Sequence, residues 1–341
     1  MKALVKTATG PGNVQICEVK EPTPSRCQVK IAIKYAGICG TDIKIRNGTA
    51  PSNPPVILGH EFCGIIEEVG KDVKNFKVGN RVVSETAASI CGFCFYCRTG
   101  NYMMCENRLS AGYGVDGGFA EFCVIREEAI HRLPDEVTFK QGALTEPLAV
   151  SVHAVLDHTK VQTGDFVLVS GVGTIGLLTA FVAKSAGAYV ILAGTSVDTE
   201  RLKVGEKLGV NVIINVEKED LYSLIKRDTN GYGVDYAFEC AGVAASVSQC
   251  IKCLRKGGSM VQTGLLEKPF QVDFNDLTRR ELSLVGTFGH KWKSWETSIR
   301  LLKHLGKKIE KVISYECSLE EWEAAFKDAE NKKGIKILLY P

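Results

Sequence analysis

Hydrophobic and polar positions follow two different patterns along the chain, and the change falls near residue 150. Before it, short β-rich runs such as QVKIAIKYAG, CGIIEEVG, NRVVSE and FAEFCVI stand between glycine-rich turns. These runs predict an irregular, mostly β domain with long loops. After it, apolar strands alternate with helical segments, which predicts parallel strands joined by right-handed crossovers. The pattern therefore predicts two domains of different class.

The second half begins with the strand FVLVS at residues 166–170, and the helix that follows it ends at Gly187. The strand YVILAG and the helix TERLKVGEKLG come next, and VIINV, VDYAFEC, SMVQTG and LSLVG predict further strands. The last strand-like run, IKILLY, stands apart from this series, and we expect it to return to the first domain. We predict domains over residues 1–150 and 151–286, with a returning segment over 287–341.

Composition narrows the class of protein. The 341 residues are 45% hydrophobic and 24% charged, with a net charge of +3, which is too small to indicate nucleic acid or an acidic membrane as a partner. The start MKALVKTATG has no signal-peptide run, and the longest apolar run, IGLLTAFVA, is too short for a membrane span. We therefore expect a cytoplasmic protein, whose thirteen cysteines stay free or bind metal.

Four cysteines stand close together in CGFCFYC and just after it, at Cys91, Cys94, Cys97 and Cys105. The spacing C-x2-C-x2-C-x7-C suits a tetrahedral zinc with no open position, which is a structural site. An iron–sulfur cluster and a C-x-x-C redox pair are the alternatives. A nucleic-acid-binding zinc ribbon is disfavoured, because only Arg98 and Arg108 lie nearby.

The first strand-to-helix junction, VSGVGTIG, carries a G-x-G-x-x-G motif. Its glycines are Gly171, Gly173 and Gly176, with Thr174 and Ile175 between the last two. Between a strand and a helix, this motif indicates a dinucleotide site whose pyrophosphate sits on the helix N-terminus. The alternative is a glycine-rich turn that only lets the helix and the strand pack closely.

The acid that the fingerprint expects about 20 residues further on is missing. Ser196 stands there, and Asp198 follows two residues later, in the turn. Thr195 and Ser196 can donate hydrogen bonds to a ribose phosphate, and Arg201 offers a positive charge. We therefore favour NADP(H) over NAD(H), and we expect Ser196→Asp to shift the preference towards NAD. The alternative is a Ser196 that tolerates either dinucleotide.

Two short motifs in the first domain carry candidate metal ligands. GICGTD contains Cys39, Thr41 and Asp42, and LGHEFCG contains His60 and Glu61. A further acid, Glu146, stands in LTEPLAV at the change between domains. A cysteine, a histidine and a carboxylate can converge on a catalytic zinc that keeps one position open. Taken singly, each residue also has an ordinary explanation as buried filler or a turn.

Together with the glycine motif, these residues resemble the zinc-containing medium-chain dehydrogenases. The resemblance covers essentially the whole chain in order, through GICGTD, GHEFCG, VGNRV, the cysteine run, GGFAEF, EPLAV and GVGTIG. GHE and EPLA are typical of the polyol and threonine dehydrogenase branch. The resemblance implies an α/β fold: a GroES-like, mostly β catalytic domain with a structural zinc lobe over about 85–106, and a Rossmann-type doubly wound parallel sheet.

The resemblance also implies roles for the site residues. Cys39, His60 and a glutamate hold the catalytic zinc, and the glutamate is Glu61 or Glu146, with exchange between them or binding through water left open. Asp42 orients the ligand histidine, or is an ordinary turn acid. Thr41 takes the proton of the substrate hydroxyl. Many relatives pass it on through a histidine, at whose place this chain has Lys44.

The resemblance places Thr287 and Phe288 close to the nicotinamide, and we add Gly264 and Leu265 to the dinucleotide-binding set. In GTFGHKWKSW, His290, Lys291 and Lys293 either meet a substrate phosphate or form a solvated basic turn before a helix, which we favour.

The function implied is hydride transfer between a secondary alcohol and a nicotinamide cofactor, which gives the ketone. The substrate class is a polyol, sugar alcohol, inositol or sugar phosphate, and the enzyme is expected to hold two zinc ions per chain and to form a homodimer or homotetramer. The alternatives are a zinc-free quinone or enoyl reductase on the same scaffold and a non-catalytic dinucleotide-binding protein. The presence of Cys39, His60 and Glu146 together argues against the first, and an intact ligand set with Thr41 argues against the second.

Overall fold

The computed structural model describes residues 1–341, which divide into two compact units. Unit 1 comprises Met1–Glu146 and Lys291–Pro341, so it contains both ends of the chain. Unit 2 is the segment between them, Pro147–His290. None of the helices combines the length and the apolar character that crossing a membrane requires.

Unit 1 is mostly β-structure. Its largest sheet has the order β10-β6-β5-β3-β18-β17, and β9 also pairs with β3. Smaller sheets have the orders β2-β1-β4 and β7-β8. The strands of this unit are β1 (Lys2–Lys6), β2 (Val14–Glu18), β3 (Gln28–Gly37), β4 (Val56–Ile57), β5 (Glu61–Val69), β6 (Arg81–Ser84), β7 (Ala87–Ser89), β8 (Leu109–Ser110), β9 (Phe122–Arg126), β10 (Ile130–Arg132), β17 (Ile313–Ser318) and β18 (Lys336–Tyr340).

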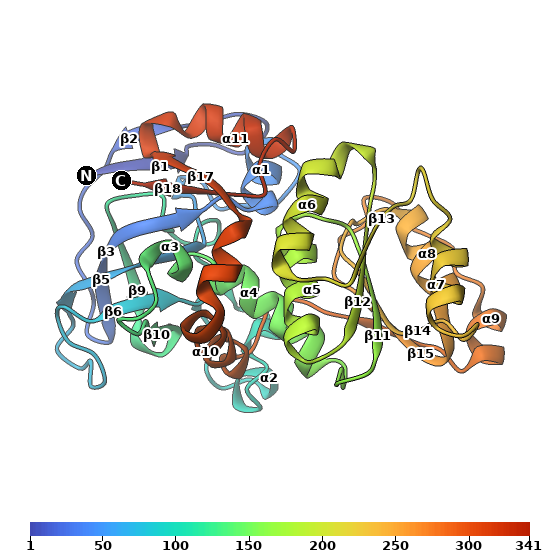
Figure 1. Ribbon diagram of the computed structural model, residues 1–341. Coiled ribbons are helices and arrows are strands. Elements are labelled where there is room, and N and C mark those ends of the chain that lie inside the picture. The colour runs from blue at the N-terminus through green and yellow to red at the C-terminus, as the bar shows by residue number, and fades with distance from the viewer. The chain divides into compact units, whose positions relative to one another are not determined.

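The C-terminal segment is part of this unit. Strand β18 lies between β3, to which it is antiparallel, and β17, to which it is parallel. Helix α11 packs against β17, β18 and α1 (Figure 1). The helices that begin in this unit are α1 (Gly40–Arg46), α2 (Phe95–Arg98), α3 (Phe139–Gly142), α4 (Thr145–Val152), α10 (Trp292–Ile309) and α11 (Trp322–Glu330).

Unit 2 is a six-stranded parallel sheet with the order β13-β12-β11-β14-β15-β16. Helices α5 and α6 cover one face, and α7 and α8 cover the other (Figure 1). Because all strands run the same way, their carboxyl ends meet at one edge. The elements are β11 (Phe166–Ser170), α5 (Thr174–Ser185), β12 (Tyr189–Gly194), α6 (Thr199–Leu208), β13 (Val212–Asn215), α7 (Leu221–Asp228), β14 (Val234–Glu239), α8 (Ala244–Cys253), β15 (Leu254–Gln262), α9 (Phe274–Arg280) and β16 (Ser283–Gly286).

Two local expectations differ from the structure. Strand β15 begins at Leu254, five residues before the apolar run SMVQTG, because LRKGG pairs with β14 through an irregular register. The expected solvated turn at 290–293 is wrong in part, since His290 is 2% exposed and Trp292 already begins α10. The start of β15 was missed because its first residues are mostly polar or glycine. The burial of His290 was missed because the identity of one polar residue does not show whether it is buried.

Candidate active site and metal centres

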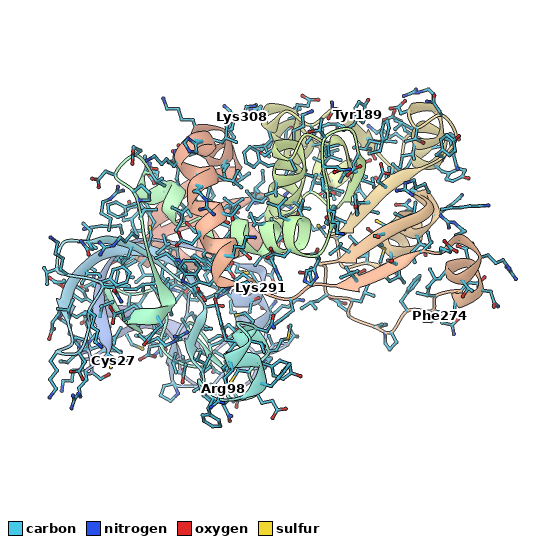
Figure 2. The ribbon with its side chains drawn as sticks, turned by 90° about the horizontal axis from the view of Figure 1, so that it is seen from below. Cys27, Arg98, Tyr189, Phe274, Lys291 and Lys308 are labelled. Carbon is cyan, nitrogen blue, oxygen red and sulfur yellow. The ribbon has the colours of Figure 1, made fainter.

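The four cysteines of the CGFCFYC region converge in unit 1. The sulfurs of Cys91, Cys94, Cys97 and Cys105 all lie within 4.8 Å of one another. None of them forms a disulfide. Helix α2 carries Cys97, and Arg98 at its end lies at the outer surface of this lobe (Figure 2). The lobe is therefore a cluster of four free thiols.

The spacing of these sulfurs fits a single tetrahedral ion. Sγ of Cys91 lies 3.9 Å from that of Cys97 and 3.7 Å from that of Cys105. Zinc–sulfur bonds of about 2.3 Å in a tetrahedron place the sulfurs about 3.8 Å apart. Backbone N–H groups, that of Cys94 first, lower the pKa of Cys91 to about 6, whereas burial raises the pKa of Cys97 to about 12. A multi-iron cluster is larger than one ion and would need the thiols further apart.

A second cluster forms where α1 begins. Sγ of Cys39, a ring nitrogen of His60 and a carboxylate oxygen of Glu61 lie within 4.8 Å of one another. Cys39 is the N-cap of α1, and Thr41 Oγ1 lies 3.7 Å from the Cys39 sulfur. Three donors of zinc-binding type thus meet in a buried part of unit 1.

Local backbone geometry aims His60 into this cluster. Gly59 has a φ of +89°, and a Cβ on it would lie 2.6 Å from the ring of Phe119, so only glycine fits there. Asp42 is fully buried; its Oδ2 accepts the N–H of Cys39 at 2.8 Å, and its Oδ1 lies 3.5 Å from Nδ1 of His60. This arrangement leaves Nε2 of His60 for a metal, with Asp42 orienting the ring.

Glu61 has a buried ion-pair partner, Lys336, which sequence motifs do not reveal. Lys336, at the start of β18, donates to Glu61 and, at 2.8 Å, to the carbonyl of Ile38. The two side chains are 2% and 1% exposed. Glu61 can therefore face a metal and a lysine at once, and the lysine balances its charge.

Glu146 lies near this cluster but outside the group of converging donors. Burial and then the charge of Glu61 raise its pKa to about 7. Burial lowers the pKa of His60, yet the negative charges of Asp42 and Cys39 outweigh this and raise it well above its ordinary value. The cluster is thus rich in negative charge, and Oδ1 of Asp42 and Nδ1 of His60 are buried without a hydrogen bond. These two atoms face each other at 3.5 Å, so a cation bound at Nε2 of His60 would offset the negative charge and leave Nδ1 to Asp42.

The glycine motif forms an open cradle in unit 2. Gly173 is the N-cap of α5, no side chain caps this helix start, and nothing lies within 4 Å of a Cβ built on it. Gly176 is tightly packed, since its Cβ would overlap the carbonyl of Gly171. Free space at the N-terminus of a twelve-residue helix suits a pyrophosphate. Thr174 and Ile175 form the first turn of that helix.

The other predicted dinucleotide residues lie at the same edge of the sheet. Gly264 and Leu265 follow β15, and Thr287 and Phe288 follow β16. Glu239, at the end of β14, is buried and accepts the N–H groups of Ala241 and Gly242 at 2.9 Å each, as well as the amide of Gln262. Glu239 therefore fixes the loops beside the cradle.

The end of β12 is less free than its sequence indicates. Thr195 Oγ1 donates to Asp198 at 2.8 Å, and the backbone N–H of Ser196 donates to Glu217 at 2.9 Å. Arg201 lies 4.0 Å from Asp198. The hydroxyls and the guanidinium expected to meet a ribose phosphate are thus close to two carboxylates.

Sequence reasoning missed Lys336, Glu239 and Glu217. A lysine in the apolar run IKILLY and an acid at the end of VDYAFE were available signals. Glu217 follows the neighbouring strand β13 rather than β12, so a motif that counts along the chain does not reach it. His290, Lys291 and Lys293 do not form one exposed group, because His290 is buried.

Two protein-family models match this chain. The model of the alcohol dehydrogenase GroES-like domain matches residues 25–135. The zinc-binding dehydrogenase model matches residues 174–304. Together they match more than half of the chain.

Similar proteins match over the full length. A sorbitol dehydrogenase of Halalkalibacterium halodurans is 42% identical over 100% of this chain and 99% of its own. A D-arabitol-phosphate dehydrogenase of Enterococcus avium is 36% identical over 99% of this chain and 97% of its own. A zinc-binding dehydrogenase of Sinorhizobium meliloti 1021, solved bound to NADP, superimposes with a TM-score of 0.92 at 31% identity and covers 100% of this chain and 99% of its own.

Proposed function

This chain belongs to the zinc-containing medium-chain dehydrogenase family, and on that premise we propose that it exchanges a hydride between a secondary alcohol of a polyol or polyol phosphate and NAD(P). The alcohol becomes the ketone. The observation that carries the proposal is the convergence of Cys39, His60 and Glu61 in a buried, negatively charged site. The polyol dehydrogenases among its relatives point to the same substrate class.

Cys39, His60 and Glu61 are the proposed ligands of the catalytic zinc. Their common separation supports this set, and Glu146, which lies outside it, supplies charge at the same site without being a direct ligand. When bound, zinc supplies Lewis-acid chemistry that makes a substrate hydroxyl more acidic. Cys91, Cys94, Cys97 and Cys105 are the proposed ligands of a second, structural zinc.

Thr41 is the proposed proton acceptor. Its hydroxyl lies 3.7 Å from the Cys39 sulfur, at the edge of the ligand cluster. It can accept the proton of the substrate hydroxyl while it gives up its own, so no charge accumulates on it. Lys44, where many relatives have a histidine, is exposed, and we propose that the proton passes from Thr41 through water instead.

The proposed dinucleotide site is the cradle at Gly173 and the sheet edge beside it. The bound dinucleotide supplies the hydride acceptor, while the chain supplies position. The absence of an acid at the end of β12 and the NADP held by the Sinorhizobium relative support the preference for NADP(H) predicted from the sequence. The carboxylates of Asp198 and Glu217 oppose it. Values of kcat/KM measured with both dinucleotides decide the preference.

The proposed enzyme works in the cytoplasm as a homodimer or homotetramer. Its thirteen cysteines are all free, which suits a reducing compartment. Native mass measurement on the purified chain tests the oligomer, and a monomer would contradict it.

A dehydrogenase screen tests the function. Sorbitol, arabitol, inositol and 2,3-butanediol, with the phosphates of the first two, are offered with NAD and with NADP, and metal is quantified in the same preparation. We expect two zinc ions per chain and turnover of at least one polyol or polyol phosphate. Cys39→Ser should lose one zinc and the turnover together. A preparation with zinc bound that oxidises none of these alcohols would sink the proposal.

A further inference from the structure

The ends of β12 and β13 lie side by side in unit 2. Gly194, the last residue of β12, is in register with Asn215, the last residue of β13. The N–H of Val216 donates to the carbonyl of Gly194 at 2.9 Å, so the chain stays beside β12 as it leaves β13. The end of β12 is where the adenosine ribose lies in a dinucleotide fold of this kind.

A tight turn then brings Glu217 back over β12. Asn215 Oδ1 accepts the N–H of Glu217 at 3.0 Å, and the amide of Asn215 donates to the hydroxyl of Ser196 at 3.0 Å. Oε2 of Glu217 accepts the backbone N–H of Ser196 at 2.9 Å. Hydrogen bonds from the Ser196 side chain and backbone lower the pKa of Glu217, so it is ionised at neutral pH.

These contacts occupy the hydrogen-bond donors and the positive charge that would otherwise bind a 2′-phosphate. The hydroxyl of Ser196 accepts the amide of Asn215 at 3.0 Å, and it also interacts with the carboxylate of Glu217. Thr195 donates both its hydroxyl and its N–H to Asp198. The guanidinium of Arg201 lies 4.0 Å from the same Asp198 carboxylate, so its charge is already matched. A phosphate arriving here meets carboxylates before it meets free donors.

We propose that Glu217 is the residue of this chain that discriminates against the 2′-phosphate of NADP, taking the place of the acid that is absent from β12. The inference rests on the dinucleotide site of the proposed function. The ionised carboxylate of Glu217, which lies beside Ser196, repels a phosphate of nearly two negative charges. The same carboxylate can accept hydrogen bonds from the free ribose hydroxyls of NAD. It holds whichever dinucleotide the native chain prefers, because it concerns the contribution of one residue.

Lys218, the next residue along the chain, limits the size of the effect. It is exposed, and its positive charge also acts on Glu217. We therefore expect a modest factor rather than an all-or-none switch. Glu219, two residues further in the same turn, is exposed and has no hydrogen bond to Ser196, which makes it a matched control for the loss of one negative charge.

The test is the binding of dinucleotides and half-dinucleotides to the zinc-loaded protein by calorimetry. The probes are NADP, NAD, 2′,5′-ADP and ADP, and the variants are Glu217→Gln and Glu219→Gln. Glu217→Gln keeps the length of the side chain and an acceptor for the Ser196 N–H, so the fold should persist, which a circular dichroism melt checks. We expect Glu217→Gln to bind NADP and 2′,5′-ADP about tenfold more tightly and ADP no more tightly.

Each outcome decides the matter. The measured quantities are the ratios of the affinities for NADP and NAD and for 2′,5′-ADP and ADP. Glu219→Gln should change these ratios less than about twofold. Equal changes in the two variants would overturn the inference, because they would show a general charge effect. No change in either variant would overturn it as well, because Glu217 would then have no influence on the choice of dinucleotide. A native protein that binds neither NAD nor NADP would overturn the proposed function, and this inference with it. An unchanged ratio in a protein that does bind them overturns the inference alone.

Discussion

Replacing Lys336 by methionine tests the buried ion pair that Lys336 forms with Glu61 beside Cys39 and His60. Methionine keeps the length of an unbranched chain but removes the charge that faces Glu61 and the donor that satisfies Ile38. Both members of the pair are almost completely buried. The variant therefore leaves a carboxylate buried without its cation wherever no metal is bound.

The size of the loss depends on the metal. Removing one partner of a buried pair costs about 3–5 kcal/mol in the free energy of unfolding. Bound zinc would neutralise Glu61 in place of the lysine, so we expect only about 1–2 kcal/mol of loss in the zinc-loaded protein. The loss of stability is thus about 2–3 kcal/mol smaller with zinc bound than without it. By linkage, the variant should bind zinc about 30- to 150-fold more tightly than the native protein. The variant should be less stable and yet bind its metal better.

The fluorescence of tryptophan is a suitable measure of stability. Trp292, Trp295 and Trp322 are the three tryptophans of the chain, and all belong to unit 1. Urea unfolding followed at these residues, with and without zinc, reports on the unit that holds the pair. Competition with a chromophoric chelator gives the zinc affinity.

Two further variants serve as controls. Lys336→Met combined with Glu61→Gln should regain much of the lost stability in the metal-free state, because the carboxylate that Lys336 faced is removed as well. Lys30→Met removes a lysine that pairs with the half-exposed Glu21 and Glu68 and should cost under about 1 kcal/mol. Equal losses for Lys336→Met with and without zinc, at unchanged zinc affinity, would refute the competition between lysine and metal.

Three other predictions follow from the same geometry. Burial raises the pKa of Glu146 from 4.5 to about 7. The metal-free protein should therefore lose about 3 kcal/mol of stability as the pH rises from about 4.5 to 7. In urea unfolding at several pH values, Glu146→Gln should reduce this dependence of stability on pH. Gly173→Ala should leave the thermal midpoint unchanged but weaken dinucleotide binding about tenfold, whereas Gly176→Ala should lower the midpoint, because its Cβ would overlap Gly171. Cys97→Ser should remove one zinc and lower stability while the other zinc stays; a folded variant that keeps that zinc but loses all turnover would contradict the division between two metal centres.

The main features of the fold are readable from the sequence because unit 2 alternates strands and helices with clear periods. FVLVS and YVILAG became β11 and β12 with the predicted bounds. The start of β15 was not readable, since its first residues are polar or glycine and only their pairing with β14 makes them a strand. The pairing of β18 with β3 likewise depends on contacts between opposite ends of the chain, which local patterns do not encode.

The candidate site was predictable where its candidate ligands stand in short motifs. Cys39, His60 and Glu61 come from two such motifs, and the structure brings them together. Lys336 could not be predicted as a partner, because 275 residues separate it from Glu61 and an isolated lysine in a strand has no spacing to test. Glu217 shows the same limit at the dinucleotide edge, where neighbouring strands and not neighbouring residues bring the charge.

The two proposed metal centres differ in the support that the chain gives them without a metal, and this difference supports the roles proposed for them. At the cluster of Cys39, His60 and Glu61, Lys336 already balances one carboxylate, and β18 belongs to the large sheet. We therefore expect the fold to survive loss of the metal there. The cysteine lobe has no comparable support: α2 buries none of its residues, and Phe93 and Phe95 are 69% and 73% exposed. Without a cation the four thiols do not all ionise, since burial and the neighbouring cysteines raise the pKa of Cys97 to about 12. We therefore expect the lobe to need an ion, which holds all four as thiolates, for its structure. A site that keeps its shape without metal suits exchange and chemistry, whereas a site that loses its shape suits a permanent ion.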